Sequence, residues 1–362
     1  MRKSRFLFFM KRLQAGRTAH SFFLLFFFLP CPSFFSFAVV DSPLKGGIGE
    51  VASPHISTPM PLTTLTLQNT NPVSMNTGIS DSSHARLDLF LKNLSDTLHA
   101  ELGVAFRDLS SGLEYSFNPN LTMHAASTMK VPVMIEVFRQ AEQGKLSLTD
   151  SVLVKNQFAS IVDGSPYSLA LADDSDEVIY KAIGHKLTIR QLVEDMITVS
   201  SNLATNLLIE LVGAKNVMNT LHELGVYNML VLRGVEDGKA YQVGLNNRTD
   251  AQSLMQIMAA IAEIRAASPA SCREMIELLK AQKFRENIPA GLPSEVVVAN
   301  KTGSITAIDH DAAILYPPER GPCVLVVLTR GIAEHERAHR TIAAITQRIY
   351  QEFMNYSPIS VK

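Results

Sequence analysis

The stretch "HAASTMKVPV" holds a serine and a lysine three residues apart, Ser127 and Lys130. On a helix these two positions share a face, so the lysine amine can lie beside the serine hydroxyl. A serine hydroxyl is a weak nucleophile that needs a base, and a lysine can be that base when burial or a neighbouring cation lowers its pKa. The pair alone carries little weight, because "SPLK" at Ser42 has the same spacing. A capping serine beside a solvated lysine is the alternative.

A second polar group stands at an expected junction between two helices, in "ITVSSNLATN". The hydroxyl of Ser200 could pass a proton to a leaving nitrogen, and the side-chain amide of Asn202 could hold a substrate amide. A capping serine and a turn asparagine are the structural alternatives.

A third group, in "VANKTGSI", ends a predicted strand. Lys301 and Thr302 offer a cation and a hydroxyl for a substrate carboxylate. Gly303 allows a substrate backbone to approach the strand edge closely. Backbone N–H groups of Ser127 and Ser304 could stabilise a developing oxyanion. An exposed strand lysine is the alternative for Lys301, but three such groups in this order favour an acyl-serine site.

The order S-x-x-K, S-x-N, K-T-G resembles the signature of class A β-lactamases and penicillin-binding proteins. The likeness covers about residues 83–357. It implies a five-stranded antiparallel sheet flanked by helices, plus an all-helical subdomain, with the site between them. By this resemblance Ser127 is acylated, Lys130 is its base or proton relay, and Ser200 is the proton shuttle. Asn202 becomes a substrate amide contact, and Lys301 with Thr302 becomes the carboxylate pocket.

The chain departs from that family pattern at two places. The usual second motif is S-D-N, but the middle residue here is Ser201, so a carboxylate that supports the loop is missing. The usual E-x-x-L-N motif, whose acid activates the deacylating water, is absent from "LRGVEDGKAYQVGLNN". Glu236 and Asp237 lie near the corresponding place, and a solvated acidic pair in a turn is the alternative. If neither acid reaches the acyl-ester, we expect a long-lived acyl-enzyme.

A competing motif lies near the end of the chain, where "EHERAHR" contains His335, Glu336 and His339 as H-E-x-x-H. This is the zinc pattern of many metalloproteases, but such a site needs a third protein ligand. The extended form requires Gly and His at positions 342 and 345, which are both Ile, and the only later glutamate, Glu352, is too close on the same helix. Apolar residues at helical spacing follow, so we expect the helix to pack on the sheet. We expect no catalytic metal and no cofactor.

The order of predicted elements indicates one α/β domain over residues 83–357. A helix and a hairpin, "GVAFRDL" and "LEYSFNP" joined at "SSG", come first. Helical segments fill the middle, and strands return in "SEVVVANKTGSI", "DAAILYPP" and "CVLVVLTRG" before a closing helix. The two ends of the domain must therefore meet in one sheet, with a helical subdomain inserted between them.

The first 38 residues carry six basic and no acidic residues, followed from residue 21 by an apolar run that ends in "SFA". This favours an export signal, or an uncleaved anchor, and hence a periplasmic or extracellular protein that meets the membrane only through this segment. Residues 39–82, rich in Pro, Gly, Ser and Thr, read as a flexible linker. The remainder has 27 basic and 34 acidic residues, a formal charge of −7, which gives no reason to bind nucleic acid. Cys272 and Cys323 are expected to be separate core residues, and a disulfide between them is the alternative in an oxidising compartment.

The sequence therefore predicts an exported acyl-serine hydrolase that opens β-lactam rings. A D-alanyl-D-alanine peptidase or slow-deacylating penicillin-binding protein is the first alternative, because it shares the acylation chemistry. A non-catalytic cell-wall sensor or binding module is the second alternative. In each enzymatic case the partner is a small amide substrate with a nearby carboxylate.

Overall fold

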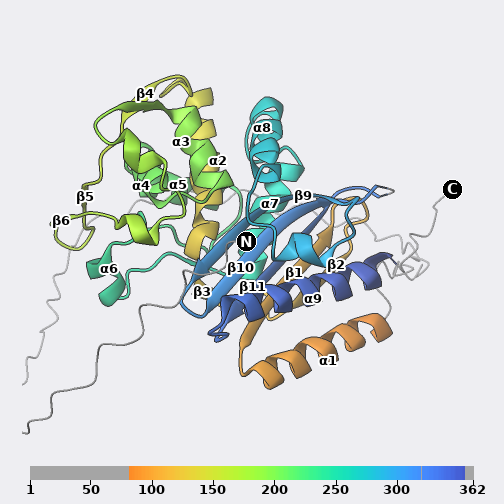
Figure 1. Cartoon of the computed structure of the whole chain (residues 1–362). Helices are drawn as coiled ribbons and strands as arrows, with labels where there is room; N and C mark the ends of the chain where they lie inside the picture. The colour runs from red at the N-terminus through yellow and green to blue at the C-terminus, as the bar shows by residue number, and fades with distance from the viewer. Residues whose placement is uncertain (1–80, 319, 355–362) are drawn as a thin grey trace, which may run out of the picture. The chain divides into compact units, whose positions relative to one another are not determined.

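The computed structural model describes residues 81–318 and 320–354, which lie in one compact unit, Pro72–Lys362 (Figure 1). Its centre is a five-stranded antiparallel sheet in the order β2-β1-β11-β10-β9. The strands are β1 (Glu101–Asp108), β2 (Glu114–Phe117), β9 (Val297–Ile305), β10 (Ile308–Tyr316) and β11 (Cys323–Arg330). The predicted hairpin and the predicted meeting of the two chain ends are confirmed, because β1 pairs with both β2 and β11.

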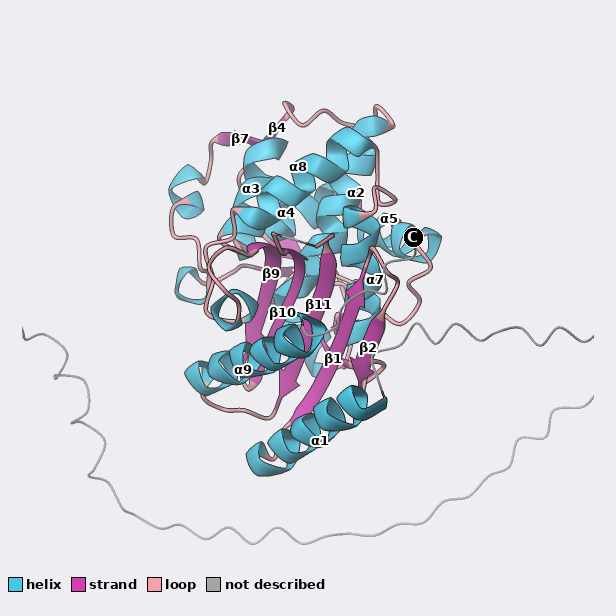
Figure 2. Ribbon diagram, turned by 90° about the vertical axis from the view of Figure 1, so that its right-hand side faces the viewer, coloured by secondary structure: helices cyan, strands magenta, loops and turns pink. Residues whose placement is uncertain are grey.

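Two helices cover one face of this sheet (Figure 2). They are α1 (Asp81–Leu98) and α9 (His335–Met354), so the first helix begins two residues before the predicted domain start. The apolar positions of α9 at core spacing are buried as expected, with Ile342 and Ile345 fully covered. They pack with Phe106 and Leu325 of the strands in one core cluster.

The opposite face of the sheet packs against helices that join it to the helical part of the molecule (Figures 1 and 2). A second, larger core cluster fills the space between them, so nearly all residues of β10 and β11 are buried, including the polar residues of β10. The helices are α2 (Lys130–Glu142), α3 (Ile189–Thr198), α4 (Asn202–Val212), α5 (Ala214–Glu223), α6 (Gly238–Gln242), α7 (Ala251–Ala262) and α8 (Pro269–Lys280).

Short elements connect these helices and border the site. The 3-10 helices are η1 (Ala126–Met129), η2 (Leu171–Asp173), η3 (Ile179–Ala182) and η4 (Ile288–Gly291). The two-residue and three-residue strands are β3 (Met123–His124), β4 (Ser151–Leu153), β5 (Phe158–Ala159), β6 (Pro166–Tyr167), β7 (Lys186–Thr188) and β8 (Arg248–Thr249). The predicted five-stranded sheet with a helical subdomain is therefore confirmed.

Other expectations concern the cysteines and the start of the chain. Cys272 and Cys323 are both buried and unpaired, as separate core residues should be. The export segment 1–38 and nearly all of the linker 39–82 lie outside the described residues. Within the described part of the chain, no helix combines the length and apolar character needed to cross a membrane.

Candidate active site

A cavity of about 310 Å³ gathers residues from all three motifs. The nucleophile segment, the junction before α4 and the end of β9 each contribute to its wall. Of the predicted site residues it contains Ser127, Ser200, Asn202, Thr302, Gly303 and Ser304.

The nucleophile segment is a tight turn pressed against the edge strand. Ser127 lies in η1, directly after Ala126, which has a φ of +45°. A Cβ atom on Gly303 would stand 3.1 Å from the backbone nitrogens of both Ser127 and Thr128. Such a contact is tighter than ordinary packing, so the glycine of K-T-G allows β9 to lie against the nucleophile.

Lys130 opens α2 and points its amine into the site from complete burial. Its Nζ donates to the carbonyl of Ser200 at 2.6 Å, to Asn202 Oδ1 at 2.9 Å and to Ser200 Oγ at 3.2 Å. Burial lowers the pKa of Lys130 to about 7, although the carboxylates of Asp174 and Glu236 act in the opposite direction. Across residues 81–318 and 320–354, no hydrogen bond joins this amine to the Ser127 hydroxyl.

Ser200 stands between two buried lysines. Its Oγ lies 3.2 Å from Lys130 Nζ and 2.9 Å from Lys301 Nζ. Burial lowers the pKa of Lys301 well below its usual value, and the neighbouring Lys130 lowers it further. The backbone of Ser200 has a φ of +60°, a conformation that costs a non-glycine residue energy and that often marks functional sites. The exposed strand lysine considered for position 301 is therefore wrong.

Glu236 reaches the same network through Asn202. The Asn202 Nδ2 group donates to Glu236 Oε1 at 2.8 Å, while Asn202 Oδ1 accepts from Lys130. Burial raises the pKa of Glu236, and the charges of Asp174 and Asp173 raise it further, against the lowering effect of the Asn202 bond. Glu236 also has a positive φ, +61°, so the loop holds it in an uncommon backbone conformation.

The loop that carries Glu236 is held by asparagines rather than by an E-x-x-L-N motif. Buried Asn206 accepts from the Val235 N–H at 2.6 Å and donates to the Val235 carbonyl at 3.0 Å. Gly234 fits only because it lacks a side chain, since a Cβ atom there would lie 2.2 Å from Asn206 Oδ1. Asn247 fixes the preceding turn through the backbone of Arg233.

Asp237 is placed differently from Glu236. Its carboxylate caps α6 by accepting from the Ala240 N–H, and it also accepts from Ser160 Oγ and the Ile161 N–H. The residue is 1% exposed, and none of these contacts leads to the cavity. These contacts favour Glu236 over Asp237 as the acid that reaches an acyl-ester. Glu236 remains a candidate for the chemistry, whereas Asp237 stabilises the loop.

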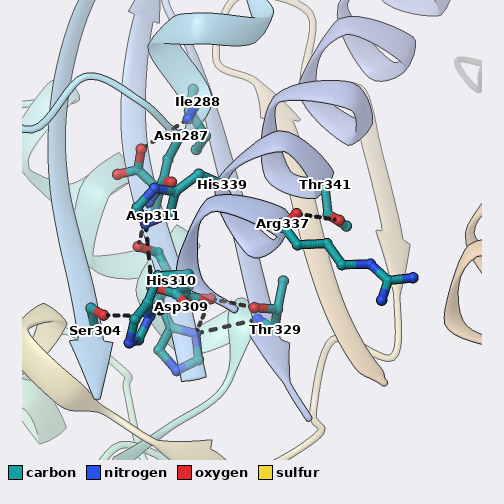
Figure 3. A network of polar contacts seen from close by, with 11 residues as sticks. Asn287, Ile288, Ser304, Asp309, His310, Asp311, Thr329, Arg337, His339 and Thr341 are labelled. Atoms are coloured by element: carbon teal, nitrogen blue, oxygen red, sulfur yellow. Dashed lines mark hydrogen bonds and ion pairs between the residues drawn. The ribbon is translucent and has the colours of Figure 1, made fainter. Parts of the chain in front are cut away.

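The two histidines of the H-E-x-x-H motif, His335 and His339, line the cavity. Figure 3 shows polar contacts around Asp309, with His339 and Ser304 among the residues drawn. His335 Nδ1 lies 2.9 Å from Asp309 Oδ2, and His339 Nε2 lies 3.4 Å from Asp309 Oδ1. Asp309 is 1% exposed, and Ser304 Oγ stands 3.3 Å from His335 Nδ1. The same imidazole nitrogen faces both the serine and the carboxylate, so this cluster cannot relay a proton as a Ser-His-Asp triad does. No group of three metal-binding side chains is found in the described residues.

Two histidines hold the turn before the nucleophile, a role that no sequence pattern signals. His124 Nδ1 accepts the Ala126 N–H at 3.0 Å, and buried His310 contacts the His124 carbonyl through Nε2 at 3.0 Å. Burial lowers the pKa of His124 to about 4, with Arg233 and His310 acting in the same direction. His124 therefore stays a neutral acceptor near pH 7.

Comparison with known proteins shows which family the chain belongs to. The family model described as "Beta-lactamase enzyme family" matches residues 86–353. The chain belongs to this family of enzymes. Among curated relatives, the extended-spectrum β-lactamase PER-1 of Pseudomonas aeruginosa is 25% identical over 244 residues, which is 65% of this chain and 76% of the relative.

Solved structures with the same fold include a β-lactamase and a protein named PBP-A. The β-lactamase of Sphaerobacter thermophilus is 26% identical with a TM-score of 0.65, covering 76% of this chain and 99% of that one. PBP-A has the same TM-score at 21% identity, covering 76% and 97%. At that lower identity the likeness shows the fold alone. The predicted resemblance, the fold and the assignment as a serine hydrolase of the β-lactamase type are confirmed.

Proposed function

We propose that this enzyme hydrolyses β-lactam amides through an acyl-enzyme on Ser127. The observation that carries the proposal is the continuous chain of contacts from Lys301 through Ser200, Lys130 and Asn202 to Glu236. It links groups suited to acylation with an acid suited to deacylation. The relatives PER-1 and the Sphaerobacter protein, both named β-lactamases, support the substrate class.

The acylation half uses the buried amine as base. With a pKa of about 7, Lys130 is partly neutral near neutral pH and can take the proton of the Ser127 hydroxyl, directly or through Ser200. The Ser127 oxygen then bonds to the lactam carbonyl carbon, and the N–H groups of Ser127 and Ser304 hold the oxyanion. When the carbonyl–nitrogen bond breaks, Ser200 donates its proton to the ring nitrogen and is reprotonated by the lysine ammonium. Thr302 and the Lys301 amine bind the substrate carboxylate, whose negative charge favours the protonated form of Lys301.

The deacylation half assigns a general base to Glu236. Its carboxylate takes a proton from a water molecule, whose oxygen attacks the ester carbonyl. When the ester carbon–oxygen bond breaks, the proton passes from Glu236 through Lys130 to the departing Ser127 oxygen, which restores the free serine and the Glu236 carboxylate. The bond from Asn202 holds the Glu236 carboxylate beside Lys130. If this step is slow, the same residues form a long-lived penicillin-binding protein, which is the second candidate; a D-alanyl-D-alanine peptidase differs in its substrate.

A fluorescent penicillin separates these possibilities. We expect transient labelling of the wild-type protein with release of hydrolysed product, and no labelling of Ser127→Ala. Persistent labelling would favour the slow-deacylating alternative. No labelling and no product from the wild type would overturn the proposal and leave a peptidase or a non-catalytic binding module, which D-alanyl-D-alanine peptides and cell-wall fragments would test.

Paired variants of the two acids test the deacylation assignment. Glu236→Gln should keep acylation and slow deacylation by about 100-fold or more, the size typical of a lost general base. Asp237→Asn should act through the loop, with a loss of thermal stability accompanying any change in rate. Stopped-flow acylation and release of a chromogenic cephalosporin measure both steps. Equal deacylation by Glu236→Gln and the parent would remove Glu236 from this role.

We also propose that the enzyme is exported, because the basic and apolar first 38 residues are typical of a signal or anchor. Fractionation of cells that express the full chain, with and without this segment, tests the location. Retention of both forms in the cytoplasm would contradict it.

A further inference from the structure

The first turn of α4 carries Asn202 into the site, so its orientation matters for the proposed chemistry. The first N–H groups of any helix lack partners within the helix and need an outside acceptor. Ser201, at the middle of the second motif, caps only the Ala204 N–H, at 3.2 Å. The N–H groups of Asn202 and Leu203 remain to be satisfied.

A carboxylate from another part of the chain accepts hydrogen bonds from these two N–H groups. Asp174, just after η2, accepts from the Asn202 N–H at 3.0 and 3.1 Å through its two oxygens, and from the Leu203 N–H at 2.8 Å. The Tyr180 hydroxyl donates to the same carboxylate at 3.2 Å, and the Asp176 N–H donates at 3.1 Å. Asp174 is 8% exposed, so its contacts are shielded from water. A negative charge is also favourable at a helix N-terminus.

The same carboxylate acts on both proton-transfer groups. Its charge raises the pKa of Lys130, partly offsetting the lowering by burial. It also raises the pKa of Glu236, adding to the effect of burial. Lys130 also interacts with Lys301 and with Glu236 itself. Glu236 also interacts with Asp173, Tyr180 and Tyr167.

We propose that Asp174 is a positioning residue of this site, which anchors the α4 N-terminus and Asn202 and sets the charge balance between Lys130 and Glu236. It thereby supplies, from a segment 27 residues earlier in the sequence, the supporting carboxylate that Ser201 does not provide. The inference rests on the proposed function for its kinetic consequences, but its anchoring contacts are independent of the substrate.

Two variants separate the charge from the anchor. Asp174→Asn keeps the size of the side chain and removes the charge, so the pH midpoint for acylation by Lys130 should fall, and so should the midpoint for deacylation by Glu236. Asp174→Ala removes the acceptor as well, so Asn202 should shift and acylation should slow on the order of 10²-fold. Stopped-flow acylation and release against pH measure both effects.

The neighbouring Asp173 provides the matched control, because it is exposed and its charge acts on Glu236 but is not among the causes of the Lys130 shift. Asp173→Asn should lower the deacylation midpoint and leave the acylation midpoint unchanged. An acylation profile of Asp174→Asn that matches the parent in both rate and midpoint would overturn the charge role.

Amide hydrogen exchange tests the anchor without any substrate. In Asp174→Ala the N–H groups of Asn202 and Leu203 should exchange faster than in the parent, while those in the middle of α4 keep their protection. Unchanged exchange at both positions would overturn the anchoring role, even in a protein that shows no β-lactam turnover. Absence of turnover in the wild type together with faster exchange in the variant would instead contradict the proposed function and retain Asp174 as the anchor.

Discussion

At the residue scale, the site depends on the buried side-chain amines of two lysines. Lys130 and Lys301 are both completely buried, and the amines of both side chains form hydrogen bonds to the Ser200 hydroxyl. Two buried ammonium groups at this distance disfavour each other's charge, so one of them can serve as a base near neutral pH. That arrangement explains why a lysine rather than a histidine can serve the nucleophile.

The pH dependence of acylation follows from the lowered pKa of Lys130, about 7. Because the neutral amine is the active form, the acylation rate should be full above that pH and should fall about tenfold per pH unit below it. Single-turnover acylation of Ser127 in the wild-type protein measures this profile. In Glu236→Gln the midpoint should lie lower, because the variant lacks a carboxylate that raises the pKa of Lys130. An acylation rate that stays constant well below pH 7 would contradict the assignment of Lys130 as base.

Individual residues could be predicted where they belong to a short sequence motif. Ser127, Ser200 and Lys301 could be proposed from the sequence because each motif fixes its residue types at short spacing, and the structure brings the three motif segments together. The contacts of Asp174 and Asp309 could not be predicted, because their partners lie far along the chain and are brought to them by loops and by strand register. Contacts of that kind leave no periodic or local trace in a single sequence.

At the element scale, close approaches at glycines decide where the site loops lie. Gly303 brings β9 against η1, and Gly234 brings the Glu236 loop against α4. Sequence patterns located β9 and α4, since β9 begins with an apolar run and α4 is rich in apolar residues. The path of the loop between residues 233 and 247 was not predictable, because side-chain bonds from Asn206 and Asn247 determine it.

A methyl group at Gly234 should disturb this loop. In Gly234→Ala the new Cβ atom would stand 2.2 Å from Asn206 Oδ1, so either the loop or the Asn206 side chain must move. Either movement disturbs the two Asn206–Val235 hydrogen bonds that hold the loop of Glu236. We expect deacylation to slow on the order of 10²-fold, with acylation much less affected. Gly238→Ala is the matched control, since nothing lies within 4 Å of a Cβ atom there. Equal deacylation rates for the two variants would contradict the argument.

At the scale of the whole molecule, the two ends of the domain meet. The first strand pairs with the last strand in one sheet, and the closing helix packs on that sheet in one core. Phe106 of β1 and Phe353 of α9 meet edge to face with ring centroids 5.0 Å apart. The sequence predicted this closure from strands at both ends of the domain. It could not predict the order β2-β1-β11-β10-β9, which depends on which strands pair over long distances.

Phe353→Ala should therefore weaken the entire domain. Loss of a buried phenylalanine from a packed core costs about 3–5 kcal/mol, and the free energy of unfolding should fall by that amount. Denaturant unfolding measures it, with the neighbouring, exposed Met354→Ala as control. If both variants unfold at the same denaturant concentration, the closing helix does not contribute to the core as argued.

The central place of β11 in this sheet has a consequence for biosynthesis. Register pairs Glu101 with Arg330, so the early hairpin keeps an open edge while the intervening residues are being made. At a translation speed of roughly 5–20 residues per second, that interval is on the order of ten seconds or more. Until then the nascent polypeptide has neither its finished sheet nor an assembled catalytic centre, and its exposed strand edge is open to aggregation or to capture by a chaperone.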